Sequence, residues 1–568
     1  MLSIRIAKSA SFWQLTAAKM KHALIAVGLG CCVLGLGCKR QPTETAAPSK
    51  PPAAKKTLLR HHFVGTAQFA TSADGTQFKK IWAMPETAPF RDALAARLAE
   101  ATGQSLAKRI PVLGTNASAF FRPLLDDLLQ AESFSEVRQT GPDVREFDLA
   151  IELGDDRAAI WSTNLWQVAA HWNGVPPVES NGNGFAGWES KKNIGADSVR
   201  FRRARQWVVV TVGRDQAPTN LLQKIIAQGR PIARAKQYWL DADVDCAQLQ
   251  SWFPNARFSA LLGDLQIENF PVAHFAVSPR DEYLITQARL EYTQPIPWRP
   301  ESWQVPTNLI QNPDDSLINF TAARGLTRLL RDSKIFDRFG WSPRPSQLFV
   351  WAYGLTPLHT FAAVPAADAT NLLAQMAPRL EAFVRSNVAD KVMGDVTWNS
   401  NRTSVTSGQM LFLQPTFSAV HVPEGDFLYC NLFPLSPVTN APPPAELMAS
   451  LARTNLIYYD WEITQHRLLQ WRAMASLTDL LRIERTILPN TPSQNWLTMV
   501  MTNVGNTVTD VSLISPKEVE ILRSAHVGLT GFELVALQRW IDANNFAPPD
   551  PESPAAQAKT ASNAPGTP

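Results

Sequence analysis

The chain has little cysteine, almost no net charge and no known catalytic signature. Only five of its 568 residues are cysteine, and only Cys246 and Cys430 lie in the part expected to fold. This number excludes a disulfide scaffold. One Cys246–Cys430 bridge and two buried free thiols both remain open at this point. A formal net charge of +4, without a long Lys/Arg run, does not predict nucleic-acid binding.

The N-terminus carries a targeting signal instead. Residues 23–37 have the sequence ALIAVGLGCCVLGLG and follow Lys19, Lys21 and His22. As a helix this run would span only ~22 Å, which is short of the ~30 Å hydrocarbon core of a bilayer. A basic flank followed by a short apolar run predicts a secretory signal peptide. Met20 could replace Met1 as the start, because the segment from Met20 is itself a complete signal.

The end of this run resembles a lipobox, the signal in which a cysteine is acylated and becomes the mature N-terminus. Residues 34–38 have the sequence LGLGC, with the small residue Gly37 before Cys38, although Gly35 stands where leucine is usual. The resemblance implies lipid attachment at Cys38, with Cys31 as the weaker candidate. Secretion without a lipid and an uncleaved membrane anchor both stay open as well. Lys39, rather than aspartate, after Cys38 favours the outer membrane over the inner one.

Composition divides the rest of the chain. We predict a signal peptide at 1–38, a disordered tether rich in Pro, Ala and Lys at 39–57, and a disordered tail at 547–568. Between them we predict two α+β repeat domains, at 58–305 and 306–546.

The two repeats are predicted from an internal similarity. Residues 238–252 align without gaps to 457–471, and each segment has the pattern of a strand, a helix cap and a helix. Residues 207–212 and 427–432 precede these segments at similar distances, and 63–68 weakly resembles 318–323. The aligned pairs are Asp241 with Asp460, Asp243 with Glu462, the caps Asp245 with Thr464, Leu249 with Leu468, and Trp252 with Trp471.

Hydrophobic periodicity predicts a mixed fold. Helices are expected at 87–101, where Thr87 is the cap and Gly103 the stop, at 367–385, and at 532–544, where Thr530 and Glu533 form a capping box. Strands are expected at 147–153, 158–163, 199–203, 208–212 and 283–290, with strand pairs in 270–292 and 496–515. Runs of strands between few helices predict an α+β fold of two similar domains, each a mainly antiparallel sheet covered by helices on one face.

Short sequences that resemble catalytic or metal-binding motifs lack the flanking residues that those motifs need. The dinucleotide-like sequence at 182–187 (GNGFAG) has neither a strand before it nor a helix after it, which favours a surface loop. Asp241, Asp243 and Asp245 imitate a calcium loop, but Cys246 and Trp252 stand where glycine and glutamate are needed. Ser105 and Lys108 have the spacing of a penicillin-binding nucleophile without its companion motifs. We therefore assign no catalytic residue, metal ligand or cofactor.

Two sets of residues have both a structural and a functional interpretation. The nine histidines, including the neighbours His61 and His62, show no ligand spacing and favour structural roles. Trp161, Trp166, Trp172 and Trp188 favour core packing. An aromatic platform for a sugar or apolar ligand is the alternative, and it would need two or more rings exposed on one face.

Taken together, the Cys38 signal, the tether and the paired segments resemble bacterial envelope lipoproteins of unknown function with a duplicated α+β unit. The resemblance implies an exported protein held through its lipid on the periplasmic face of a membrane, and it assigns no site residue. The weak net charge gives no reason to expect a nucleic-acid partner. We expect a binding or scaffold module whose protein, glycan or apolar ligand is unknown. An apolar-ligand carrier would need an apolar cavity in each copy. An envelope-polymer hydrolase would need converging ionisable side chains in one cleft.

Mass spectrometry of the mature N-terminus tests the anchor. We expect a peptide that begins at Cys38 and carries fatty acyl chains, and the Cys38→Ser variant should lose them. An unmodified peptide that runs through Cys38 would contradict lipid attachment there, and Cys31→Ser is the control for the weaker candidate position.

Overall fold

The computed structural model describes residues 56–107, 117–141, 144–190, 198–213, 220–231, 238–248, 270–296, 300–310, 316–330, 334–354, 359–387, 395–407, 414–432, 445–482 and 490–543. The predicted signal peptide with Cys38, the tail and most of the tether lie outside these residues. The first strand begins at Lys56, so folded structure starts just inside the segment predicted to be tether.

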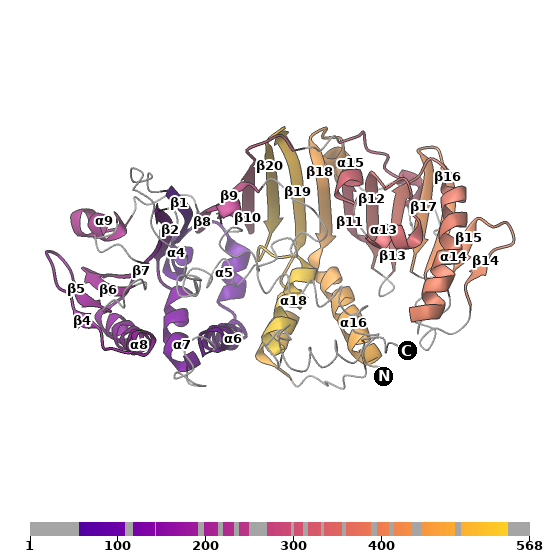
Figure 1. Cartoon of the computed structure of the whole chain (residues 1–568). Helices are drawn as coiled ribbons and strands as arrows, with labels where there is room; N and C mark the ends of the chain where they lie inside the picture. The colour runs from indigo at the N-terminus through magenta and orange to yellow at the C-terminus, as the bar shows by residue number, and fades with distance from the viewer. Residues whose placement is uncertain are drawn as a thin grey trace, which may run out of the picture.

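The described strands form one antiparallel sheet of 20 strands along the length of the molecule (Figure 1). Across the first half of the chain the order is β4 (Val178–Glu179), β5 (Ala186–Glu189), β6 (Ser198–Ala204), β7 (Trp207–Gly213), β3 (Val144–Glu152), β2 (Ser133–Gly141), β1 (Lys56–Phe63), β8 (Leu240–Asp245), β9 (Val272–Arg280) and β10 (Tyr283–Glu291). It continues through β20 (Glu518–Ala525), β19 (Asn506–Ser515), β18 (Leu456–Ile463), β11 (Leu317–Arg324), β12 (Gln347–Tyr353), β13 (Thr360–Pro365), β17 (Gly425–Asn431), β16 (Thr416–Val422), β15 (Ser404–Thr406) and β14 (Thr397–Trp398). The fold class is therefore α+β with a large antiparallel sheet, and the strands of the two halves join instead of forming two separate sheets.

Strand order is the same on both sides of the β10–β20 pair. Counted outward from this pair, the third strand is β8 in the first half and β18 in the second. The fourth strand is β1 in the first half and β11 in the second. Each pair of central strands, β9–β10 and β19–β20, closes through a two-residue turn, between Arg280 and Tyr283 and between Ser515 and Glu518. These turns are 235 positions apart, and so are Gln287 and Leu522, which lie directly opposite each other. A local two-fold axis therefore passes through the Gln287–Leu522 pair.

Residue register in the sheet differs from the predicted alignment. Directly opposed residues on antiparallel strands point to the same face. The opposed residues can be followed from β8 through β9, β10, β20 and β19 to β18. They place Ala242 on the same face as Tyr458 and Asp460, and Asp241 on the other face. The prediction that Asp241 and Asp460 occupy equivalent places is therefore wrong by one residue, and a one-residue shift reverses the face of every side chain.

Helices cover both faces, not one as predicted. The face that carries Ile151 and Asp460, called here the helix face, packs against a row of larger helices that includes α6, α7, α8, α16 and α18 (Figure 1). The other face, called the opposite face, is covered locally by α9 in the first half and by α15 with η2 in the second. The helices are α4 (Thr66–Thr71), α5 (Thr76–Trp82), α6 (Thr87–Ala107), α7 (Ala117–Leu128), α8 (Asp155–Asn173), α9 (Asn220–Gln228), η2 (Thr307–Leu309), α12 (Leu326–Leu329), α13 (Lys334–Phe339), α14 (Ala369–Asn387), α15 (Ala445–Leu451), α16 (Thr464–Arg482), α17 (Pro492–Met501) and α18 (Gly531–Asp542).

Local helix signals agree with the structure where the cap chemistry is complete. The Thr530 hydroxyl accepts from the Glu533 N–H and the Glu533 carboxylate accepts from the Thr530 N–H, so the predicted capping box at α18 is confirmed. Asp245 accepts from the Gln248 N–H, as expected of a cap after β8. Gly103 does not end its helix, because α6 continues to Ala107. A Cβ at Gly103 would lie 2.7 Å from the Ser118 nitrogen, so this glycine allows α7 to approach closely.

Two strand predictions and one predicted similarity are wrong because helices begin in these segments. Residues 158–163 lie in α8, which begins after Gly154 with Asp155 and Asp156 in its first turn. In 496–515 only β19 is a strand, because Thr491 caps α17 and Pro492 starts it. The weak similarity of 63–68 to 318–323 fails as well, since β1 ends at Phe63 and α4 begins at Thr66.

No helix in the described ranges is both long and apolar enough to cross a bilayer.

Gly103→Val tests the close contact of α6 with α7. The new side chain would press on the Ser118 backbone, so we expect the free energy of unfolding to fall by about 2 kcal/mol. Ala96→Val on the exposed side of α6 is the matched control, and it should cost no more than about 0.5 kcal/mol through helix propensity. Equal urea midpoints for the two variants would contradict this role.

Candidate functional site

The structure does not bring the sequence-predicted candidates into one site. Residues 182–185 lie in the turn between β4 and β5, with Gly184 at φ 86°, and 186–187 begin β5, so a short strand precedes the segment against the prediction, but no helix follows it. Ser105 lies within α6, and Lys108 lies outside the described residues. All four tryptophans belong to one core cluster, with Trp161 and Trp188 fully packed and Trp166 and Trp172 against them, which confirms the packing interpretation.

Cys246 and Cys430 are both free thiols, so the bridge left open by the sequence does not form. Burial raises the pKa of the Cys246 thiol to about 11 and that of Cys430 to about 12. At neutral pH neither is a reactive thiolate. Among the described residues no group of three or more His, Cys, Asp or Glu side chains is arranged to hold a metal ion.

The strongest concentration of chemistry is a row of charged side chains on the opposite face in the first half. Its members lie directly across from one another on successive strands, and we call them the charged row. From the centre outward they are Arg289, His274, Asp243, Arg60, Glu136, Asp148, the uncharged Thr211, Arg200 and Glu189, on β10, β9, β8, β1, β2, β3, β7, β6 and β5. The inner members are half-exposed, whereas Asp148 and Arg200 toward the outer end are 0% exposed.

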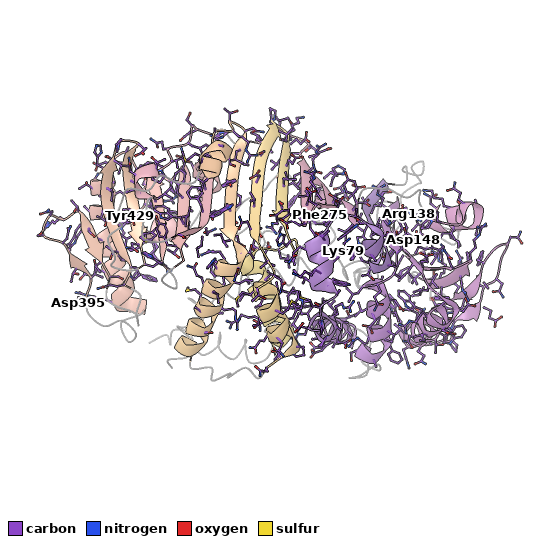
Figure 2. All side chains as sticks on the ribbon, turned by 180° about the vertical axis from the view of Figure 1, so that it is seen from behind. Lys79, Arg138, Asp148, Phe275, Asp395 and Tyr429 are labelled. Atoms are coloured by element: carbon purple, nitrogen blue, oxygen red, sulfur yellow. The ribbon has the colours of Figure 1, made fainter. Side chains whose placement is uncertain are left out.

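The buried end of the row is an ion-paired network. Arg138 Nη2 donates to Glu146 Oε2 at 2.8 Å and to Asp148 Oδ2 at 2.6 Å. Arg200 Nη2 donates to the other oxygen of Glu146 at 2.9 Å. Thr211 Oγ1 donates to Asp148 Oδ1 at 2.7 Å. Figure 2 shows Arg138 and Asp148 side by side in this part of the sheet.

Burial dominates the titration of this network. It raises the pKa of Asp148 to about 7, although the positive charge of Arg138 opposes the shift. Arg202, two residues along β6 from Arg200, has its pKa lowered by burial and then by the charge of Arg200. Perturbed groups of this kind concentrate at functional sites, but structural ion pairs also produce them.

Several guanidinium nitrogens in the network make no hydrogen bond, although Arg138 Nε lies 4.0 Å from Glu136 Oε2. They are Arg138 Nε, Arg200 Nε and Nη1, and Arg202 Nε and Nη1. Arg202 is 5% exposed and lies over the Phe185 ring at 5.1 Å. A buried donor without a hydrogen-bond partner costs free energy, so an acceptor would stabilise each of these nitrogens.

A second network adjoins the first on β1. His62 lies between Asp241 and Glu132, with 3.2 Å to an oxygen of each, and stacks on Phe134. Burial of the ring disfavours its charged form, but the hydrogen bonds to Asp241 and Glu132 outweigh this, and the pKa of His62 is raised. Arg230 donates to the same Glu132 oxygen at 2.9 Å. The carboxylates of Asp241 and Glu132 thus contact His62, Arg60 and Arg230 of the chain itself.

The same sheet positions in the second half carry aromatic rings. Counted outward from the two-fold axis, Asp243, Arg60, Glu136 and Asp148 correspond to Trp461, Phe320, Trp351 and Phe361. The flanking pair of Arg138 with Glu146 corresponds to Tyr353 with His359. These rings belong to one apolar core in which Trp351 stacks on Phe361 with centroids 5.7 Å apart, and Figure 2 marks Tyr429 of this core at the far end of the molecule.

The acidic residues of β18 have a structural role. Glu462 accepts from the Gly531 N–H at 2.7 Å, which fixes the start of α18 to the sheet. Asp460 accepts from Thr321 at 2.5 Å. Burial raises the pKa of both carboxyls, that of Glu462 to about 7. The network lies under α16 and α18 and anchors these helices.

A cavity of about 90 Å³ lies between α16, α17 and α18. Its lining includes Arg472, Arg539, Gln494 and Gln538. Its volume has room for only a few waters, and it is far too small and polar for a lipid chain.

The charged row was missed from the sequence, although a signal was present. Alternate charged residues occur at 136 and 138, at 146 and 148, and at 200 and 202, which is the period of one strand face. Only the order β6, β7, β3, β2 makes these three pairs neighbours. The predicted acidic face of Asp241 and Asp243 joins the row through Arg60, which lies 2.7 Å from Asp243.

Comparison of the chain with protein-family models, with curated proteins and with solved structures gave no match.

Asp148→Asn tests the electrostatics of the network. The Asp148 pKa is about 7 in the folded chain and about 4 when unfolded. Between these values the folded state holds a proton that the unfolded state has released. The native chain should therefore lose stability, on the order of a few kcal/mol, relative to Asp148→Asn as the pH rises from about 4 to about 7, and level off above.

Urea midpoints measured across this range provide the check. The control is Asp155→Asn, which changes an exposed carboxylate paired with Arg203. A pH profile of Asp148→Asn parallel to that of the native chain would contradict the shifted titration.

Proposed function

We propose that the chain is an exported, lipid-anchored envelope protein whose folded part is a binding module rather than an enzyme. The leader that ends at Cys38 supports export and anchoring on the periplasmic face of a membrane, with the outer membrane favoured. The matching strand order about the Gln287–Leu522 pair supports an origin from two copies of one α+β unit. The first copy provides the ligand site and the second a purely structural core.

One observation carries the binding role: corresponding sheet positions hold charges in the first half and aromatic rings in the second. Buried ion pairs rarely stabilise a fold more than well-packed apolar residues do, because removing charges from water is expensive. The second half supplies the comparison within the same chain, since Trp351 and Phe361 are 0% and 2% exposed where Glu136 and Asp148 stand in the first half. The charges of the first half are therefore attributed to recognition.

An apolar-ligand carrier and a hydrolase have less support. A carrier needs an apolar cavity in each half, and the described cavity is small and lined by arginines. A hydrolase needs ionisable groups open to a substrate, whereas Asp148 and Glu146 are buried and held by arginines. The charged row fits the binding of a charged ligand better than either.

Replacement of the whole network by apolar residues tests this proposal. The variant Arg138→Met, Glu146→Met, Asp148→Leu, Arg200→Met and Thr211→Val removes the charges together. We expect it to remain folded, with an unfolding midpoint equal to or above that of the native chain. Arg138→Met alone should lose about 3–5 kcal/mol, because it leaves Glu146 and Asp148 without their main partner.

Circular dichroism and urea unfolding of the two variants show whether the charges are needed for folding. If the combined variant loses its fold as the single one does, the charges serve the architecture and the binding role fails. A folded combined variant beside a weakened single one supports it.

A further inference from the structure

A continuous series of charged side chains crosses the strands between the first-half core and the centre of the sheet. Cations and anions alternate along it, and successive members lie between 2.7 and 3.7 Å apart. Three of these contacts join directly opposed residues, two between β1 and β8 and one between β8 and β9. We call this the ion-pair series, and its members in order are Arg230, Glu132, His62, Asp241, Arg60, Asp243, His274 and Glu291.

His62 is the buried titratable link of this series. Its side chain is 5% exposed, and each ring nitrogen lies 3.2 Å from a carboxylate oxygen, Nδ1 from Asp241 and Nε2 from Glu132. Ionised carboxylates only accept hydrogen bonds, and a neutral imidazole has a single N–H. Only the protonated ring can therefore donate to both carboxylates.

The groups packed around His62 favour its charged form. Arg60 and Arg230 contact the two carboxylates and not the ring. The Phe134 ring of β2 stacks on His62, Ala276 of β9 lies opposite Asp241, and α9 faces this part of the sheet with leucine and isoleucine side chains. The ring thus lies between two acids in surroundings that are otherwise apolar.

The pKa of His62 agrees with this geometry. Burial disfavours the charged ring, but the hydrogen bonds to Asp241 and Glu132 outweigh it and raise the pKa above its ordinary value of 6.5. The preceding residue, His61, is kept neutral, because burial and then the charge of His62 lower its pKa to about 4. The positive charge at this point of β1 therefore belongs to His62.

The second half joins the corresponding strands without charge. Counted outward from the two-fold axis, His62 and Asp241 correspond to Ala322 and Tyr459, which lie directly opposite each other on β11 and β18. Both belong to the apolar core of that half. This pair needs no proton, so a response through His62 is specific to the first half.

β9 has little packing of its own to hold it in place. None of its nine residues is buried, since eight are half-exposed and the last is exposed. β8 and β9 also lie between the first-half core and the central β10–β20 pair (Figure 1). Elements with few buried contacts open at low free-energy cost. The position of β9 therefore depends on strand pairing and on the side chains of the ion-pair series.

We propose that His62 is a proton-dependent clasp that holds β8 to β1 and so joins the central strands to the first-half core. Loss of the proton leaves one N–H for two carboxylates, so one of them loses its donor and its positive neighbour. β8 and β9 then loosen from the first-half core. The device belongs to the folded chain and needs no ligand, so it stands apart from the proposed binding role.

The direction of the pH response follows from the titration of His62. The folded chain holds this proton more tightly than the unfolded chain does, so the clasp gives its full stabilisation below about pH 6.5. The stabilisation is lost as the pH rises through the higher pKa of the folded state.

Hydrogen exchange of the full-length protein, read by mass spectrometry, tests the clasp. Amide protection of β8 is compared between the native chain and His62→Gln, which supplies an amide donor without a charge. At about pH 6 the native chain should protect β8 roughly tenfold more than the variant does, the factor expected for one charge-assisted hydrogen bond. At about pH 9 the two should be equal, because the native ring is then neutral as well. β12 of the second half should be protected equally in both chains.

His274→Gln is the matched control. The His274 ring is 42% exposed toward the far end of the ion-pair series, where water can replace its contact with Asp243. This variant should protect β8 as the native chain does at both pH values. Exchange of the imidazole C2 hydrogen in the native chain gives the protonation midpoint of His62 without any substitution, and we expect it above 6.5.

Three results would overturn the inference. They are a His62 midpoint at or below 6.5, a native-to-variant ratio of β8 protection that is the same at both pH values, and an equal loss of β8 protection in His62→Gln and His274→Gln. The midpoint decides the question by itself if His62→Gln does not fold. None of these results bears on the combined apolar variant, so the clasp and the binding role fail or stand separately.

Discussion

The pairing of β10 with β20 is the interaction on which the architecture depends. Eight residues of β10, from Leu284 to Glu291, lie opposite eight of β20. This pairing covers one strand edge of each half, β10 in the first and β20 in the second, and an unpaired edge is a site for aggregation. It also sets the position of the helix layer. Phe90 of α6 stacks on Trp496 of α17 at 3.9 Å, so the apolar core under the sheet crosses from one half of the chain to the other.

The two ends of the sheet use the same strand order with opposite chemistry. In the second half, large rings fill the opposite face and the core needs few polar partners. In the first half, the same positions carry acids and arginines, and the apolar contacts on that face shrink to the cluster under α9, which includes Phe134, Trp207 and Val209. A buried charged network stabilises the fold only when its hydrogen bonds are complete. A buried charge without a partner costs much more free energy than an apolar side chain at the same place. The arginine nitrogens without a hydrogen-bond partner are therefore an energetic cost of this arrangement.

Predictions from the sequence were correct where the interaction joins residues close in the chain, and wrong where it joins distant ones. The capping box of Thr530 and Glu533 and the cap at Asp245 were correct because each is completed within three residues. The stop at Gly103 and the strand at 158–163 were wrong, since packing against α7 and the start of α8 decide them. The alignment of Asp241 with Asp460 shows the limit most clearly. Similar residues stand at similar places in the chain, but a shift of one position along a strand turns their side chains to opposite faces.

The sequence alone determined the α+β class and the alternating charges of individual strands, and it alone predicts the export signal, because these depend on composition and on periods of a few residues. Tertiary structure alone decided that the two halves share one sheet and that Arg138, Glu146, Asp148 and Arg200 form one network. These residues come from three strands up to 62 positions apart in the chain. Their meeting depends on which strands become neighbours, and long-range pairing of strands has no signature in the local sequence.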